Sequence, residues 1–358
     1  MTASPLGSTP PLPRTHFRLP DELSAAAPPE SRGLARDGVR LLVASGDGVY
    51  HAQFPDLAAH LRPGDLVVVN TSGTLPAAVD AVRSDGRAAV VHFSTPAPEG
   101  DWLVEVRDGE GKGDGPVRDA RAGERVPLDG GGTLGLREAF PDAARSIGSR
   151  LWRARLDAGR DVPAYLAQHG RPIRYGYVPL RWPLADYQTI FATHPGSAEM
   201  PSAGRPFTDR LVTRLVTSGV AVAPVILHTG VASLEAAEPP YAEWFDVPAP
   251  TARLVQHTRA SGGRVVAVGT TVTRALETVA DPDGRVRPGR GWTDLMLGPD
   301  RPARVVSGLI TGLHAPEASH LHLLEAVAGA DLVRRCYDAA LHERYLWHEF
   351  GDCCLLLP

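Results

Sequence analysis

The chain has 358 residues, of which 43% are hydrophobic and 22% charged, and its net charge at pH 7 is −4. This length exceeds what one hydrophobic core usually organises, so two domains are expected. The acidic balance argues against a protein that neutralises nucleic-acid phosphates over its whole surface, because such domains are strongly basic.

The three cysteines, Cys336, Cys353 and Cys354, cannot build a disulfide framework, and no CxxC motif is present. This usage is typical of a reducing compartment. The N-terminus has no apolar signal region, and no run approaches the ~20 apolar residues that span a bilayer. We therefore expect a soluble, cytoplasmic protein that makes no membrane contact and is a monomer.

The residue pattern changes twice in the first half of the chain. Residues 1–14 are rich in Pro, Ser and Thr and are expected to be a disordered leader. Two β-branched runs, 39–43 and 66–69, follow as strands, and the second is continuously apolar, as in a strand buried on both faces. From 78 to 156, short strands alternate with glycine-rich turns such as 109–115, which predicts an inserted antiparallel β-barrel or sandwich.

Helices and strands alternate in the second half. We expect a helix over 161–168 and a second helix that Thr208 caps. Further strands are predicted at 220–227, 265–268 and 305–310, and further helices from about Thr251, around 274–277, over 321–328 and over 332–342. This order predicts an α/β fold, with a mainly parallel or mixed sheet in a large domain (15–77 and 157–358) that the small β domain (78–156) interrupts.

The turn formed by Gly269, Thr270 and Thr271 follows an apolar strand and opens a helix. The free N–H groups and the positive dipole end of such a junction can hold a carboxylate or a phosphate. The turn is also a common way to cap a helix. On its chemistry alone, the ordinary cap is the better interpretation.

Two other groups of polar residues are less specific. His314, His320 and His322 lie close together, but their spacing matches no zinc motif, so no metal is expected. Asp294 precedes an apolar stretch and fits equally well as a ligand-binding carboxylate or as a turn cap. Composition and periodicity give no further chemistry.

The amino-acid sequences of nine segments resemble those of the S-adenosylmethionine:tRNA ribosyltransferase-isomerase family of queuosine biosynthesis. The segments occur in the family's order and extend over nearly the whole chain: 17–20, 63–70, 186–192, 201–204, 227–230, 268–271 with Arg274 and Leu276, 293–295, 311–314 and 350–352. The resemblance implies a large α/β domain interrupted by a small β domain, as the residue pattern also predicts.

The resemblance also implies a reaction. S-adenosylmethionine serves as a cosubstrate, with no bound cofactor, and gives its ribosyl portion to 7-aminomethyl-7-deazaguanine in tRNA. Adenine and methionine leave, and epoxyqueuosine remains. The positive sulfonium acidifies the neighbouring C5′ protons, so the reaction needs a base, an acid for the departing adenine and a pocket that excludes water.

Motif membership suggests roles for individual residues as hypotheses. Residues 269–271 and Arg274 would hold the methionine carboxylate. Tyr187 and Gln188 would line the adenosine pocket, and Pro201 to Gly204 would form a neighbouring wall. The acid and base candidates are His314, His228 and Asp294.

The chain departs from the family pattern inside three motifs. Thr71, Ser72 and Gly73 replace the usual Asp-Thr-Arg, Arg205 and Pro206 replace Leu-His, and Glu317 replaces a lysine. Losing basic residues weakens phosphate binding. Three functions therefore stay open: the family reaction on tRNA, the same donor chemistry on a small molecule or nucleoside, and a non-catalytic S-adenosylmethionine-binding protein.

Overall fold

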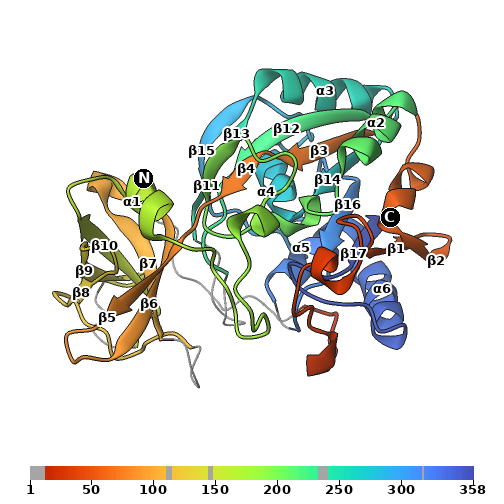
Figure 1. Cartoon of the computed structure of the whole chain (residues 1–358). Helices are drawn as coiled ribbons and strands as arrows, with labels where there is room; N and C mark the ends of the chain where they lie inside the picture. Colours follow the sequence, from red (N-terminus) through yellow and green to blue (C-terminus); the bar gives the residue numbers. More distant parts are fainter. Residues whose placement is uncertain (1–12, 110–114, 144–147, 233–240, 317) are drawn as a thin grey trace.

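A nine-stranded mixed sheet forms the larger lobe of the molecule (Figure 1). The computed structural model describes residues 13–109, 115–143, 148–232, 241–316 and 318–358. Residues 1–12 of the predicted leader, 110–114 of the predicted turn, and Glu317 lie outside these ranges. The strands are β1 (Arg40–Ser45), β2 (Gly48–Gln53), β3 (Leu66–Asn70), β12 (Ala221–Leu227), β13 (Glu243–Val247), β14 (Val265–Val268), β15 (Gly289–Thr293), β16 (Gly308–Gly312) and β17 (Cys353–Leu357).

The strand order is β15-β13-β12-β3-β14-β16-β17-β1-β2. Strands β12, β3, β14 and β16 are parallel, and antiparallel pairs extend the sheet at both sides. The apolar run of β3 is buried at every residue, because helices cover both faces of a parallel sheet. The predicted α/β class with a mixed sheet is confirmed.

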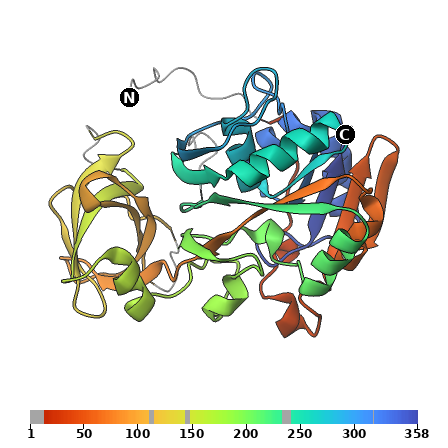
Figure 2. The ribbon, with the colours of Figure 1, turned by 90° about the horizontal axis from the view of Figure 1, so that it is seen from above.

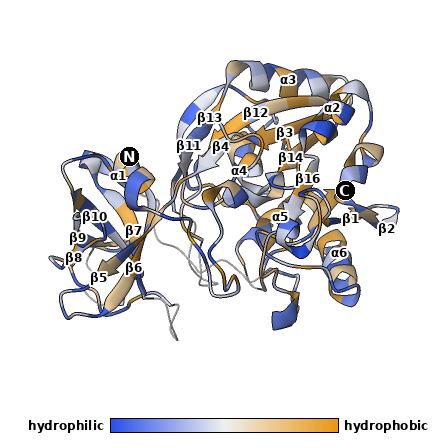
Figure 3. Ribbon diagram, viewed as in Figure 1, coloured by the Kyte–Doolittle hydropathy of each residue, from blue (hydrophilic) through white to orange (hydrophobic). Residues whose placement is uncertain are grey.

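Successive side chains of the strands point to opposite faces of the large sheet and form two apolar layers. On one face, Leu66 and Val68 pack with α3 (Ala249–Ala260), α4 (Thr270–Thr278), α5 (His320–Ala328) and α6 (Ala330–His342). On the other face, Val67 and Val69 pack with α2 (Asp209–Thr217) and the 3-10 helix Phe54–His60. Figure 3 shows these central strands as strongly hydrophobic. In the described ranges, no helix has the length and apolar character required to cross a membrane.

A six-stranded antiparallel sheet forms the smaller lobe, which Figure 2 shows beside the large sheet. Its order is β5-β6-β7-β10-β9-β8, and a bridge between Ala81 and Leu128 brings its edges together like a barrel. The strands are β5 (Ala78–Val82), β6 (Ala88–Pro96), β7 (Trp102–Asp108), β8 (Arg125–Pro127), β9 (Thr133–Phe140) and β10 (Leu151–Asp157). Helix α1 (Val162–His169) adds its apolar side chains to this core. The domain boundaries themselves stay a prediction.

One predicted strand begins later than expected. The sequence predicts a strand over 305–310, but β16 begins at Gly308. The buried carboxylate of Glu277 accepts hydrogen bonds from the backbone N–H groups of Arg304, Val305 and Val306 at 2.8 to 3.0 Å. These backbone N–H groups therefore donate to Glu277 and not to a neighbouring strand, so strand pairing starts only at Gly308.

Candidate active site

A pocket of about 380 Å³ opens where the carboxyl ends of β12, β14 and β16 meet. The residues that follow these strands, 229–231, 269–271 and 313–315, line it. This volume and this edge of an α/β sheet are typical of small-molecule sites. The side toward the small sheet is formed by Ile173, Tyr175, Tyr177 and residues 198–203, since Ile173 and Ala198 also join the small sheet's core.

The turn at Gly269 delivers the N-terminus of α4 to this pocket. Gly269 has φ 92° and ψ 161°, a backbone conformation that residues other than glycine rarely adopt. The side-chain amide of Asn70 donates to Oγ1 of Thr271 at 3.2 Å and to the carbonyl of Leu227 at 2.8 Å. Asn70 thus fixes the turn against β12, and Gly269, Thr270 and Thr271 all line the pocket.

We expect Gly269→Ala to weaken S-adenosylmethionine binding and lower stability. The added Cβ has room, since its nearest neighbour would be 3.4 Å away. The strained backbone costs about 1–3 kcal/mol or shifts the turn. Isothermal titration and denaturant unfolding measure both effects. Gly312→Ala is the matched control, because Gly312 also lines the pocket but has no positive φ. Equal behaviour of the two variants would contradict the prediction.

Arg274 lines the pocket with its charge already paired. Its guanidinium forms an ion pair with Glu243 and donates to the carbonyls of Thr293 at 3.0 Å and Leu295 at 3.2 Å. Oε1 of Glu243 in turn accepts the backbone N–H of Gly230 at 2.8 Å. Arg274 therefore ties β13, β15 and α4 together at the pocket wall.

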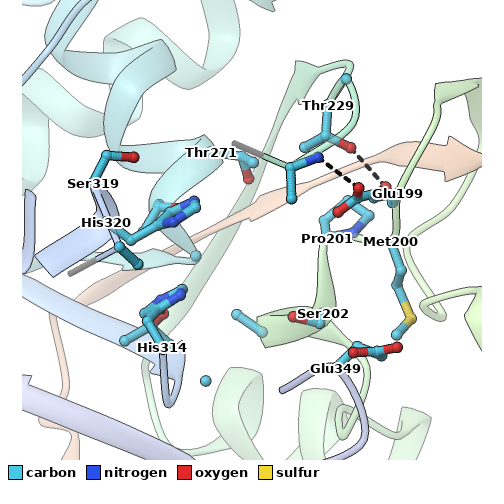
Figure 4. A pocket seen from close by; sticks show the side chains of 18 of the residues that line it. Glu199, Met200, Pro201, Ser202, Thr229, Thr271, His314, Ser319, His320 and Glu349 are labelled. Atoms are coloured by element: carbon cyan, nitrogen blue, oxygen red, sulfur yellow. Dashed lines mark hydrogen bonds between the residues drawn. The ribbon is translucent and has the colours of Figure 1, made fainter. Parts of the chain in front are cut away.

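Two stacked histidines form one side of the pocket (Figure 4). The rings of His314 and His320 lie 4.6 Å apart and 5° from parallel, and Nε2 of His314 lies 2.9 Å from Oγ1 of Thr311. Burial lowers the pKa of His314 well below its ordinary value and that of His320 to about 4. Both imidazoles are therefore neutral at pH 7, so each has one unprotonated ring nitrogen, and the lowered pKa makes each ring a weaker base than a free histidine.

Two carboxyl groups, which the sequence did not single out, lie on the opposite side (Figure 4). Oε1 of Glu199 accepts from the hydroxyl of Tyr175 and from the N–H of Ala232, and Oε2 of Glu349 accepts from the hydroxyl of Tyr177 at 2.6 Å. Burial raises the pKa of Glu199 to about 7, and also that of Glu349. Neither carboxyl group forms an ion pair with any residue in the described ranges.

Only part of the sequence-predicted set lines the pocket. Tyr187 and Pro201 do, and burial raises the pKa of the Tyr187 phenol. Gln188 lies outside the lining and hydrogen-bonds both backbone groups of Thr74, at 3.0 and 2.8 Å. Gly204 also lies outside it, packed on Thr189.

The other two acid and base candidates lie outside the lining as well. Asp294 is exposed just after β15. His228 stacks on Trp244 with ring centroids 5.2 Å apart, and its Nδ1 lies 2.7 Å from Oγ of Ser72. Burial lowers the pKa of His228 to about 4. Their roles stay a prediction that the arrangement does not favour.

The altered motifs have structural partners of their own. Ser72 belongs to β4 (Ser72–Thr74), which pairs in parallel with β11 (His194–Ser197), and its Oγ lies 2.6 Å from Oγ of Ser197. Arg205 is buried, pairs with Glu30 at 2.9 Å and lies over the ring of Phe350. Among the described residues, no group of three or more His, Cys, Asp or Glu could hold a metal ion.

A pocket of this size at the strand ends of an α/β sheet, with titratable groups on two sides, defines an enzyme of the α/β class. The family model described as Queuosine biosynthesis protein matches residues 12–356. The chain is 34% identical to the S-adenosylmethionine:tRNA ribosyltransferase-isomerase of Gloeobacter violaceus, covering 96% of this chain and 94% of that protein. It is 35% identical to the enzyme of the same name from Symbiobacterium thermophilum, covering 95% and 98%. The chain belongs to the S-adenosylmethionine:tRNA ribosyltransferase-isomerase family.

A solved structure agrees with this assignment. The crystal structure of S-adenosylmethionine tRNA ribosyltransferase from Thermotoga maritima is similar to the chain with a TM-score of 0.52 and 27% sequence identity. The match covers 96% of this chain and 99% of that one. The architecture implied by the sequence motifs, a large α/β part with a small β-barrel-like part, is confirmed.

Proposed function

We propose that this protein catalyses the reaction after which its relatives are named. It transfers the ribosyl portion of S-adenosylmethionine to 7-aminomethyl-7-deazaguanine in tRNA and isomerises it to epoxyqueuosine, with release of adenine and methionine. The observation that supports this best is the pocket itself, where proton acceptors and acidic groups face each other beside a helix N-terminus. S-adenosylmethionine is a cosubstrate, so no resident cofactor is needed. The buried free thiols suit a cytoplasmic location.

The N-terminus of α4 would bind the methionine carboxylate of the donor. Its first-turn N–H groups and dipole favour an anion, and the turn at Gly269 faces the pocket. Arg274 is bound to Glu243, so its contribution would be to shape this turn and to add positive potential. Tyr187 and Pro201 would contact the adenosine portion.

His314 would be the base that removes the C5′ proton beside the sulfonium. It is the one member of the predicted acid and base set that lines the pocket, and its ring is neutral. The hydrogen bond to Thr311 and the stack on His320 fix its orientation. Loss of the proton creates an ylide-like centre from which adenine can be expelled.

The acceptor base would enter the pocket and leave its phosphates outside. Among the described lining residues, the single lysine or arginine is Arg274, which is paired. A nucleobase that is flipped out of an RNA loop fits such a pocket, since its backbone stays at the surface.

An adenine-release assay tests this function. We expect S-adenosylmethionine to yield adenine and methionine only when tRNA containing 7-aminomethyl-7-deazaguanine is added. The two products are measured by chromatography, and tRNA with unmodified guanine is the control. Release without RNA would replace the tRNA acceptor by a small molecule. A thermal shift with the donor, together with no adenine under either condition, would leave only a binding function.

A further inference from the structure

The carboxyl group of Glu199 is fixed at one oxygen and open at the other. Oε1 receives both the hydroxyl of Tyr175 and the N–H of Ala232, and no described residue donates to Oε2. The hydroxyl of Thr229 donates to the backbone carbonyl of Glu199 at 2.6 Å, which holds the main chain in place (Figure 4). The group is therefore a rigid acceptor with one free oxygen on the pocket wall.

Tyr175 connects this carboxyl group to the small sheet. The guanidinium of Arg107, on β7, lies 5.5 Å from the centre of its ring, and His92, on β6, meets the ring edge-on at 6.3 Å. On its other side the ring lies 6.1 Å from that of Tyr177, which holds Glu349. Arg107 and His92 of the small sheet thus help to position the Tyr175 hydroxyl, which donates a hydrogen bond to Glu199.

The charge balance of the pocket favours a cationic ligand at Glu199. The stacked histidines are neutral, and Glu243 already pairs with Arg274. Glu199 and Glu349 are the remaining acidic groups on the lining, and neither has a cationic partner in the described part of the chain. Burying a carboxylate without a counter-ion is costly, so an ammonium ion is the complementary ligand.

We propose that Glu199 binds the primary ammonium group of the acceptor and takes its proton, and that Tyr175 positions Glu199 for this step. The inference rests on the proposed function, in which the acceptor carries an aminomethyl group. One N–H bond breaks and the proton passes to Oε2. The electron pair left on nitrogen then forms the C–N bond to the electrophilic ribosyl carbon, which adenine has left with the electron pair of its own C–N bond, while Glu199 becomes a neutral carboxylic acid. It returns the proton to water after the products leave.

The protonation state of Glu199 suits this role at neutral pH. Burial raises its pKa to about 7, the hydrogen bonds from Tyr175 and Ala232 oppose that rise, and the negative charges of Glu349 and Glu105 add to it. The surrounding phenols of Tyr175, Tyr177 and Tyr241 stay protonated, since burial raises their pKa well above 10. The basic form of Glu199 therefore grows as the pH rises through about 7, and the reaction rate should rise with it.

The first test measures binding and needs no turnover. The free base 7-aminomethyl-7-deazaguanine and its 7-methyl analogue, which lacks the amine, are titrated into the protein in the presence of S-adenosylmethionine. We expect wild type to prefer the amine by about 10-fold to 100-fold, as for a hydrogen bond to a charged group. Glu199→Gln should abolish this preference and Glu349→Gln should keep it. No preference in wild type, or an undiminished one in Glu199→Gln, would overturn the inference.

The second test measures single-turnover transfer of the ribosyl portion to the modified tRNA against pH. We expect Glu199→Gln to slow this transfer about 100-fold and to lose the rise near pH 7. Tyr175→Phe should keep the rise but shift its midpoint, because the hydrogen bond from the Tyr175 hydroxyl affects the pKa of Glu199. A purely structural role for Tyr175 would leave the midpoint unchanged. If wild type releases no adenine but prefers the amine, the proposed function fails and the Glu199 site stands. If wild type releases adenine and Glu199→Gln keeps both the rate of ribosyl transfer and its pH profile, the inference fails and the function stands.

Discussion

Replacing His314 by alanine is expected to slow adenine release about 100-fold to 10,000-fold, the usual contribution of a positioned base. The substitution removes the ring nitrogen that would accept the C5′ proton. Donor binding should change little, because the helix N-terminus and the residues proposed to hold S-adenosylmethionine stay in place. The rate is measured in a single turnover with saturating donor and modified tRNA, and donor affinity by isothermal titration.

The control for this variant is His320→Phe. It keeps a ring stacked on His314 but removes both nitrogens of the neighbouring imidazole. We expect this variant to retain most of the activity. A His314→Ala protein that turns over donor at the wild-type rate would remove His314 from the mechanism. Equal losses in the two variants would show that the stack matters and not the base.

Replacing Glu277 by alanine is expected to lower the free energy of unfolding by about 3–5 kcal/mol, because a fully buried charged network loses its acceptor. The side chain is not exposed at all and accepts three successive backbone N–H groups, from Arg304 to Val306. It also pairs with Arg301 at 3.5 Å. Without it, these donors would be buried with no partner.

Denaturant unfolding followed by circular dichroism measures this loss. Glu343→Ala is the matched control, since that side chain is half exposed and its removal should change stability by no more than about 0.5 kcal/mol. Glu277→Gln should be less damaging than alanine, because Oε1 alone accepts from all three N–H groups and an amide oxygen in its place keeps these hydrogen bonds. A Glu277→Ala protein as stable as the control would show that water replaces the carboxylate without cost.

The sequence predicted the fold well where local signals and global packing agree. Thr208 caps α2 through its side chain, and Asp161 caps α1 in the same way. The apolar run of β3 is central and buried, and the glycine-rich region forms the small antiparallel sheet. Local pattern was insufficient for β4 and β11, because these short polar strands exist only through pairing between distant segments.

The site was harder to predict, because its chemistry depends on burial. The turn at Gly269 reaches the pocket, although its local chemistry alone favours an ordinary helix cap. Asp294 and His228 carry reactive groups in familiar motifs, yet the chain folds them away from the lining. Glu199 and Glu349 have perturbed pKa values only because tertiary packing buries them beside tyrosines. The one hint for Glu199 was a carboxylate in an otherwise apolar stretch before Pro201.

The position of β17 affects how the protein is made. This strand is buried along its whole length between β16 and β1, and Leu41 of β1 pairs with Cys353. During translation, β1 emerges early and must keep one edge of backbone groups and apolar side chains bare until residue 357 leaves the ribosome. A chain that lacks β17 would therefore expose an unpaired, aggregation-prone edge in the middle of the large sheet.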